Sequence, residues 1–171
     1  MNAEAELSVG SQWNIPELQI PIKGNIRHVP IGSCIDGFFL TRFVSYEFKH
    51  CSALILKTNT FITHFGFFHI YPGQMIEEDS LQTESLKRLK GAKGILVEGS
   101  ESTPKGYLLR DLKKRFGIEV ARPPIPINTN RIGTDPAEKT PYPYHVVFRP
   151  ASNEILVARL SHNDIVSLTG F

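Results

Sequence analysis

The alternation of hydrophobic and polar positions predicts a β-rich first half of the chain. Leu18, Ile20 and Ile22 alternate with polar residues and Pro21, which predicts an early edge strand, because proline cannot donate to a strand ladder. Three later apolar stretches are rich in Ile, Leu, Val and Phe and are bounded by turn residues. They predict strands at residues 37–44, 52–57 and 61–71.

The second half of the chain mixes helical and strand patterns. Leu86 and Leu89 lie one helical turn apart, which predicts a short helix over 83–89. A longer apolar stripe after Pro104 predicts a helix over 105–116. Strands are predicted at 94–97 and 118–121, with a hairpin of 144–148 and 155–160 around a turn at 150–153; residues 122–143 form a long Pro-rich loop.

Composition fits one folded domain. The chain has 171 residues, 41% of them hydrophobic and 21% charged, so we expect a single domain over 1–171 with a flexible arm at 1–16. The chain lacks a run of about 20 apolar residues, so no membrane partner is expected. A net charge of +2, with the two signs interleaved, argues against nucleic acid as a partner.

Two cysteines cannot form a disulfide scaffold, which favours a reducing compartment. The first ten residues carry two Glu and no Lys or Arg, so neither a secretory signal nor a transit peptide is predicted. The predicted location is the cytoplasm, with leaderless secretion left open. The sequence does not indicate the oligomeric state.

One segment carries residues suited to nucleophilic chemistry. Cys51 precedes an apolar strand and His64 follows it across a short turn, so residues 51–66 predict one β-hairpin. If the loop holds only residues 58–59, Cys51 lies opposite Gly66, and Cys51 and His64 are diagonal neighbours on one face. An odd loop without a bulge would place the pair on opposite faces. Gly66 would leave space beside the sulfur.

A neighbouring imidazole can convert a thiol, with its pKa near 8.5, into a thiolate nucleophile. Cys51 and His64 are therefore the predicted dyad. Such dyads usually have a third group that orients the imidazole, and Ser45, six residues before Cys51, supplies a suitable hydroxyl. Cys51 could instead be a buried packing residue, since cysteine is among the most buried residue types.

Other candidates stay open beside this dyad. Cys34, preceded by Gly-Ser, forms a rival pair with His50. His69 is predicted on the strand face opposite His64, as a packed residue. No spacing of Cys and His residues matches a metal site, so no metal is expected.

The run from Cys51 to Leu56, a short turn, and then His64 and Gly66 resembles the Cys-strand-turn-strand-His hairpin of the CheD chemoreceptor deamidases and the cytotoxic necrotising factor-type toxins. The order of later elements, a strand at 95–97, a helix at 105–116, a strand at 117–120 and a hairpin at 145–160, is also similar to CheD. The resemblance spans residues 45–160. It implies an α/β (α+β) fold, in which mixed sheets form a β-sandwich with helices packed on the outside.

The resemblance further implies a cysteine-dependent amidohydrolase that deamidates glutamine side chains of a protein substrate through a thioester. By position, Cys51 is the nucleophile, His64 the base and Ser45 the third member. No cofactor is implied, and the partner is a protein that carries the target glutamine. Two alternatives remain: a non-catalytic binding module on the same fold, and a thiol peptidase or transamidase.

Overall fold

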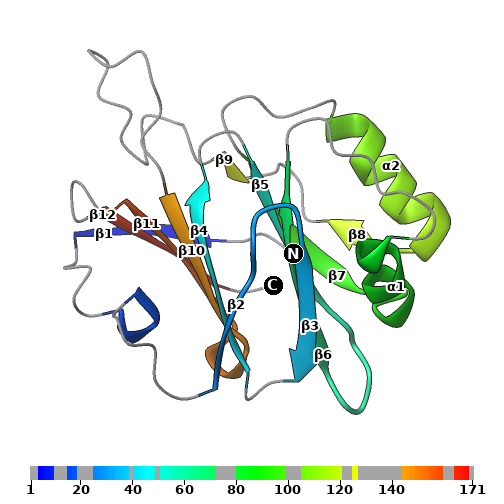
Figure 1. Ribbon diagram of the computed structural model, residues 1–171, viewed down its shortest axis with the longest axis horizontal. Helices are drawn as coiled ribbons and strands as arrows, with labels where there is room; N and C mark the ends of the chain where they lie inside the picture. The colour runs from blue at the N-terminus through cyan, green and yellow to red at the C-terminus, as the bar shows by residue number, and fades with distance from the viewer. Residues whose placement is uncertain are drawn as a thin grey trace.

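The chain folds into an α+β structure of two mixed β-sheets and two α-helices within the residues that the structure describes. Figure 1 shows this computed structural model. The described residues are 4–9, 15–18, 25–38, 41–48, 51–71, 80–98, 105–120, 125–126, 144–159 and 164–169.

The first sheet joins the two ends of the described chain (Figure 1). All its strand pairs are antiparallel except β2 with β4, which are parallel. In spatial order its strands are β1 (Glu4–Val9), β12 (Asp164–Thr169), β11 (Glu154–Arg159), β10 (Tyr144–Arg149), β4 (Arg42–Phe48) and β2 (Ile26–His28).

The second sheet is built around the β5–β6 hairpin. Strands β3, β6, β5 and β7 pair antiparallel, whereas β8 and β9 both pair parallel with β7. Its strands, in spatial order, are β3 (Cys34–Phe38), β6 (His64–Ile70), β5 (Ser52–Lys57), β7 (Lys93–Glu98) and β8 (Glu119–Val120), with β9 (Ile125–Pro126) also on β7.

The main hydrophobic core lies between the two sheets. Side chains from both sheets contribute to it, so the sheets pack face to face and bury their inner faces. The first sheet supplies Phe43, Phe48, Tyr144, Val146, Phe148, Ile155 and Val157, and the second supplies Cys51, Ala53, Ile55, Phe65, Phe67, Ile95 and Val97.

The two helices cover the outer face of the second sheet (Figure 1). Helix α1 (Leu81–Arg88) begins where the Ser80 hydroxyl accepts a hydrogen bond from the Thr83 amide. Helix α2 (Lys105–Phe116) is followed by Gly117, whose φ of 64° a glycine adopts without strain. A second apolar core fills the space between these helices and the alternate residues of β5, β6 and β7.

Several predicted elements are confirmed. The strand predicted at 52–57 is β5, the helix predicted at 105–116 is α2, and the helix predicted at 83–89 overlaps α1. The hairpin of β10 and β11 turns through a 3-10 helix, η3 (Pro150–Ser152), and Asn153 in the left-handed conformation. The long loop predicted at 122–143 lies outside the described residues except for β9.

Other predicted elements are wrong. The apolar run at 37–44 is not one strand, because it is divided between β3 and β4, which belong to different sheets. The arm predicted as flexible at 1–16 contains β1, which pairs with β12 along its whole length. Leu18, where the early strand was expected, ends a 3-10 helix, η2 (Pro16–Leu18), and residues 19–22 of that strand lie outside the described part.

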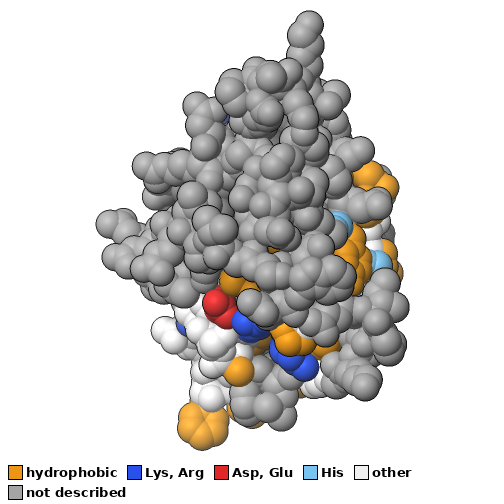
Figure 2. Space-filling view, turned by 90° about the vertical axis from the view of Figure 1, so that its left-hand side faces the viewer, with side chains coloured by type: hydrophobic (Ala, Val, Ile, Leu, Met, Phe, Trp, Pro, Cys, Tyr) orange, Lys and Arg blue, Asp and Glu red, His pale blue; other side chains and the backbone are white. Residues whose placement is uncertain are grey.

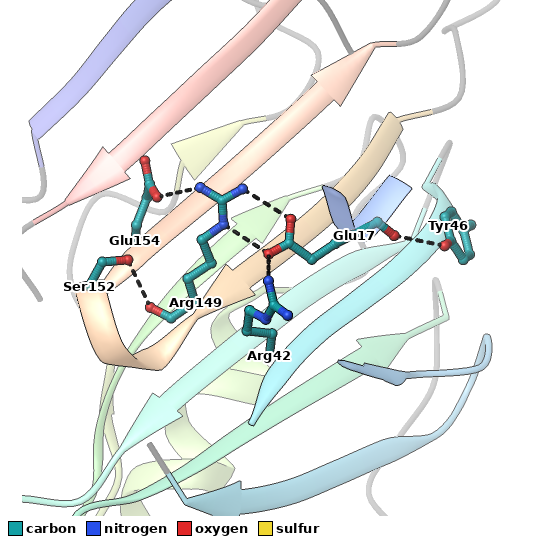
Figure 3. A network of polar contacts seen from close by, with 6 residues as sticks. All are labelled: Glu17, Arg42, Tyr46, Arg149, Ser152 and Glu154. Carbon is teal, nitrogen blue, oxygen red and sulfur yellow. Dashed lines mark hydrogen bonds and ion pairs between the residues drawn. The ribbon is translucent and has the colours of Figure 1, made fainter. Parts of the chain in front are cut away.

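A buried ion network fixes η2 to the first sheet (Figure 3). The Glu17 carboxylate is fully buried and accepts two hydrogen bonds from Arg149, both 3.0 Å long. Arg42 donates a third at 3.3 Å, and Arg149 also contacts Glu154 at 3.1 Å. Burial alone would raise the pKa of Glu17, but the hydrogen bond to Arg149 and the positive charges of Arg149 and Arg42 more than offset it, so the pKa lies below its usual value.

We expect Glu17→Gln to lower the free energy of unfolding at neutral pH by about 3 kcal/mol, because it breaks a buried ion pair. The lowered pKa of Glu17 means that its contribution is present above about pH 4.5 and is lost as the pH falls through the folded-state pKa. The difference between the two proteins should therefore shrink at acid pH. Urea unfolding at several pH values measures this.

The matched control is Glu154→Gln, which removes the more exposed carboxylate on the same arginine. This variant should cost less than about 1 kcal/mol, since an accessible ion pair contributes little. Equal losses for the two variants would contradict a special role for the buried carboxylate.

Candidate functional site

The register of the β5–β6 hairpin separates Cys51 from His64. Lys57 pairs with Phe65, and beyond that pair the Thr58 amide donates to the His64 carbonyl at 2.9 Å. The connecting loop is therefore residues 59–63, an odd number, which places the two side chains on opposite faces of the hairpin. They also lie at opposite ends of it, roughly 20 Å apart by strand geometry.

The predicted Cys51–His64 dyad is therefore wrong, because the loop holds five residues, an odd number, where two were predicted. The error began at Phe61 and Ile62, whose apolar side chains suggested a strand although both are exposed in the loop. Gly66 does not lie beside the sulfur either. A Cβ atom there would come within 2.4 Å of Leu89, so the glycine admits α1 onto the sheet.

His64 belongs to a polar cluster that joins β3, β6 and α1. Its Nε2 lies 2.8 Å from Asp36, which also receives two hydrogen bonds from Arg88, at 2.8 and 2.9 Å, and one from Ser85 at 2.9 Å. Burial favours a higher pKa for Asp36, but Arg88 and Ser85 outweigh it and hold the pKa below its usual value. This cluster connects a helix to two strands and is a structural tie.

The rival pair of Cys34 and His50 gains no support here. Cys34 lies on β3 next to α1, and burial raises the pKa of its thiol. His50 lies outside the described residues.

The structure instead brings Ser45 together with His69. The Ser45 Oγ lies 2.7 Å from the His69 Nδ1 and 2.6 Å from the Val29 carbonyl oxygen, and both side chains are fully buried. The His69 ring also stacks on Phe48, with ring centroids 3.8 Å apart and the planes 11° from parallel. His69 is thus a packed residue, as predicted, but one that is held on two sides by polar and aromatic contacts.

A β-bulge in β4 makes this arrangement possible. Ser45 and Phe48 are three positions apart, so a regular strand would direct them to opposite faces. Ser45 pairs with Val146 whereas Phe48 pairs with Tyr144, so three steps along β4 match two along β10. The extra residue turns both side chains toward the space between the sheets, where His69 lies.

The hydrogen bonds fix the tautomer of His69. The Ser45 hydroxyl has one hydrogen, and it donates that hydrogen to the Val29 carbonyl. The hydroxyl oxygen must then accept from the imidazole, so Nδ1 carries the proton and Nε2 keeps a free lone pair. This Nε2 is buried and has no hydrogen-bond partner among the described residues.

The imidazole of His69 is neutral at physiological pH. Burial, with a smaller contribution from the nearby His28, lowers its pKa from 6.5 to about 4. A neutral ring with its Nδ1 proton engaged presents Nε2 as a hydrogen-bond acceptor and a base.

Cys51 lies on the same face of the hairpin as His69. His69 pairs with Ala53, and Cys51 is two positions before Ala53, so Cys51 and His69 are diagonal neighbours, with Cα atoms about 7–8 Å apart by strand geometry. Cys51 is a buried member of the inter-sheet core, 8% exposed, and burial raises the pKa of its thiol. In the resting structure both groups are therefore neutral.

Ser45, which was predicted to orient His64, lies beside the imidazole of His69 instead. The sequence itself offered a way to find His69. When the loop of a hairpin holds an odd number of residues, two side chains on its two strands share a face if their positions differ by an even number, and positions 51 and 69 differ by 18.

A scan against protein-family models finds no family that matches this chain, and a search of curated proteins finds no match either. Within the described residues, no group of three or more His, Cys, Asp and Glu side chains is arranged to hold a metal ion. The helices in that part of the chain are too short or too polar to cross a membrane.

We expect the stability of the protein to fall as the pH decreases from about 6.5 to about 4. The lowered pKa of His69 means that the unfolded chain binds the proton more tightly over this interval, which corresponds to about 3 kcal/mol. His69→Phe keeps an aromatic ring against Phe48 but does not titrate. Its unfolding free energy should therefore depend less on pH across the interval, as urea unfolding will show.

Imidazole NMR provides the direct check on this prediction. A titration midpoint near 6.5 for His69 in the folded protein would contradict the buried, neutral ring.

Proposed function

We propose that this chain is a cysteine-dependent amidohydrolase that deamidates glutamine side chains of a protein substrate. Cys51 is the nucleophile, His69 the base and Ser45 the hydroxyl that orients the imidazole. One observation carries the proposal: the unpaired, buried Nε2 of His69 lies on the same hairpin face as the Cys51 thiol, with Nδ1 held by Ser45.

The energetic cost of this arrangement supports a functional role. A buried polar atom without a partner costs about 1–3 kcal/mol. Apart from the Ser45 hydroxyl, which also bonds to the Val29 carbonyl, the described neighbours of His69 belong to the apolar core, so a phenylalanine or leucine at position 69 would avoid that cost. A histidine kept here with one nitrogen unsatisfied fits an active site better than a packing role.

The reaction follows from these groups. Attack by the Cys51 sulfur on the carboxamide carbon transfers the thiol proton to Nε2 and forms a tetrahedral intermediate. Collapse of the intermediate expels ammonia, which takes the proton from the imidazolium, and leaves a thioester. Water activated by Nε2 then hydrolyses the thioester, which releases glutamate and restores the thiol.

The low polarity around the pair bears on the proton transfer. Each of the two shifted pKa values, that of the thiol and that of the imidazole, reflects the cost of forming one charge by itself in the closed core. Transfer from sulfur to nitrogen creates both charges together, and their attraction in a poorly solvated site offsets part of the cost. Ser45 contributes by keeping the proton on Nδ1 and stabilising the imidazolium that forms.

The arrangement of the sheets and helices supports this proposal. Two sheets that face each other across one core, with helices on the outer face of one sheet, are consistent with the CheD-like β-sandwich that the sequence resemblance implies. The hydroxyl, thiol and imidazole keep their order along the chain, with His69 in place of His64. A free thiol of this kind suits a reducing compartment such as the cytoplasm.

Native-state alkylation tests the pairing without knowledge of the substrate. In a Cys34→Ser background, iodoacetamide should label Cys51 at least about fivefold more slowly after His69→Phe, because the thiolate forms less readily without its base. His64→Phe is the matched control and should leave the rate unchanged. Equal rates in the His69 variant and its parent would instead favour a non-catalytic binding module.

Turnover tests the reaction type. With a library of glutamine-containing peptides, we expect ammonia release that is abolished by Cys51→Ser and lowered on the order of 10²–10⁴-fold by His69→Asn. Cys34→Ser and His64→Asn should retain full activity. Peptide cleavage would indicate a peptidase, incorporation of an added amine a transamidase, and activity that survives Cys51→Ser would refute the proposal.

A further inference from the structure

The loop between β5 and β6 carries two apolar side chains into solvent. Phe61 is 105% exposed and Ile62 is 65% exposed, and we call these two residues the apolar tip. Phe38, 56% exposed, lies at the adjoining end of β3 and stacks on His64, with ring centroids 5.2 Å apart. Figure 2 shows a hydrophobic projection at the lower end of the molecule, the end where Figure 1 places this loop.

Hydrogen bonds hold the loop that presents the apolar tip. The Thr58 amide donates to the His64 carbonyl, and the His64 amide donates to the Thr58 hydroxyl, both at 2.9 Å. The Thr60 hydroxyl donates to the Ile62 carbonyl at 2.7 Å. The apolar side chains are therefore projected from an ordered loop, and their exposure needs a reason outside the fold.

Positive charge gathers at the same end of the second sheet. Lys57, the last residue of β5, pairs with Lys93, the first of β7. Arg88 is connected to the loop by a chain of contacts: it donates a hydrogen bond to Asp36, and Asp36 contacts His64, which follows the loop. The last turn of α2 lies at the same end of the sheet, because the Gly91 amide donates a hydrogen bond to the Phe116 carbonyl at 2.9 Å.

These cations define the basic end of the molecule. Among the described residues its members are Lys57, Arg88, Lys90, Lys93, Lys113, Lys114 and Arg115, and the described acidic residues among them are Asp36, Asp111 and Glu119. Seven cationic side chains against three acidic ones leave four positive charges, whereas the whole chain carries only +2. The rest of the chain therefore carries a net charge of −2 (+2 minus +4).

We propose that the basic end docks on an anionic lipid bilayer, with Phe61 and Ile62 inserted at the boundary between headgroups and acyl chains. Apolar side chains flanked by Lys and Arg are the combination that binds such surfaces, since burial of the ring and attraction to anionic headgroups act together. The basic residues are spread over strand and helix ends around the loop, which fits a broad charged surface better than one pocket of a protein.

This docking sets the orientation of the molecule. Lys57 and Cys51 lie at opposite ends of β5, about 20 Å apart by strand geometry, so the Cys51 end faces away from the bilayer. The sequence expectation of no membrane partner rested on the lack of a long apolar run, a criterion that does not detect two side chains at a loop tip.

Vesicle co-sedimentation tests the proposal on the intact chain. The protein should bind vesicles of phosphatidylserine and phosphatidylcholine, bind much less to phosphatidylcholine alone, and be released by high salt. Phe61→Ser with Ile62→Ser should weaken binding at least about tenfold. Lys90→Gln with Lys93→Gln should weaken it by about tenfold as well, since each lysine near the surface contributes a severalfold gain.

Leu81→Ser is the matched control, because Leu81 is 83% exposed at the other end of α1 from Arg88. It should bind like the parent protein. The Phe61→Trp variant adds a direct readout: its tryptophan emission should shift to the blue with anionic vesicles, against the background of Trp13, the only natural tryptophan.

Two results would overturn the proposal. One is a failure of the parent protein to bind anionic vesicles, as expected if the tip docks on an acidic protein. The other is unchanged binding by the Phe61 and Ile62 double variant, whose exposed positions leave the free energy of unfolding unaffected. Neither result depends on the activity of Cys51.

Discussion

The pairing of Lys57 with Phe65 determines which groups of this protein can meet. Strands β5 and β6 are buried on both faces, so their register decides which side chains enter the inter-sheet core and which lie under the helices. In this register His69 faces the first sheet. A slip of one residue would move it beneath α1 and expose its polar ring to the second core. The imidazole, its partners and the thiol all depend on that single alignment.

The candidate site also depends on how the two sheets pack. His69 comes from the second sheet, whereas Ser45 and Phe48 come from the first, and Cys51 lies just before β5 in the second. Ser45 and Phe48 share β4 and His69 lies on β6, so the contacts of His69 with these two side chains cross the interface between the sheets. Rigid strands on both sides give the site a fixed geometry, but any change in inter-sheet spacing would be felt directly by the hydrogen bond between Ser45 and His69.

Local patterns predicted those parts of the fold that local interactions determine. The apolar stripe of α2 and the continuous apolar run of β5 indicated the bounds of these elements, because the pattern that marks each one lies within a single short segment of the chain. The division of residues 37–44 between two sheets could not be seen, since both strands are apolar and only their distant partners distinguish them. The same holds for the bulge in β4, which appears only against β10.

The candidate site shows the same limit. Residue type and spacing suggested Ser45 and Cys51 as candidates, whereas which histidine shares a face with Cys51 depends on the length of one loop. Phe61 and Ile62 disguised that length, because exposed apolar side chains in a loop look like the start of a strand.

The pairing of β1 with β12 has a consequence for the order of the chain. Glu4 lies directly opposite Thr169, so the first and last described strands meet side by side at one edge of a sheet. A short peptide could bridge them, and the chain could then be opened at the turn that follows β10. Whether this rearranged chain still folds would reveal whether β10 and β11 must be consecutive in the sequence.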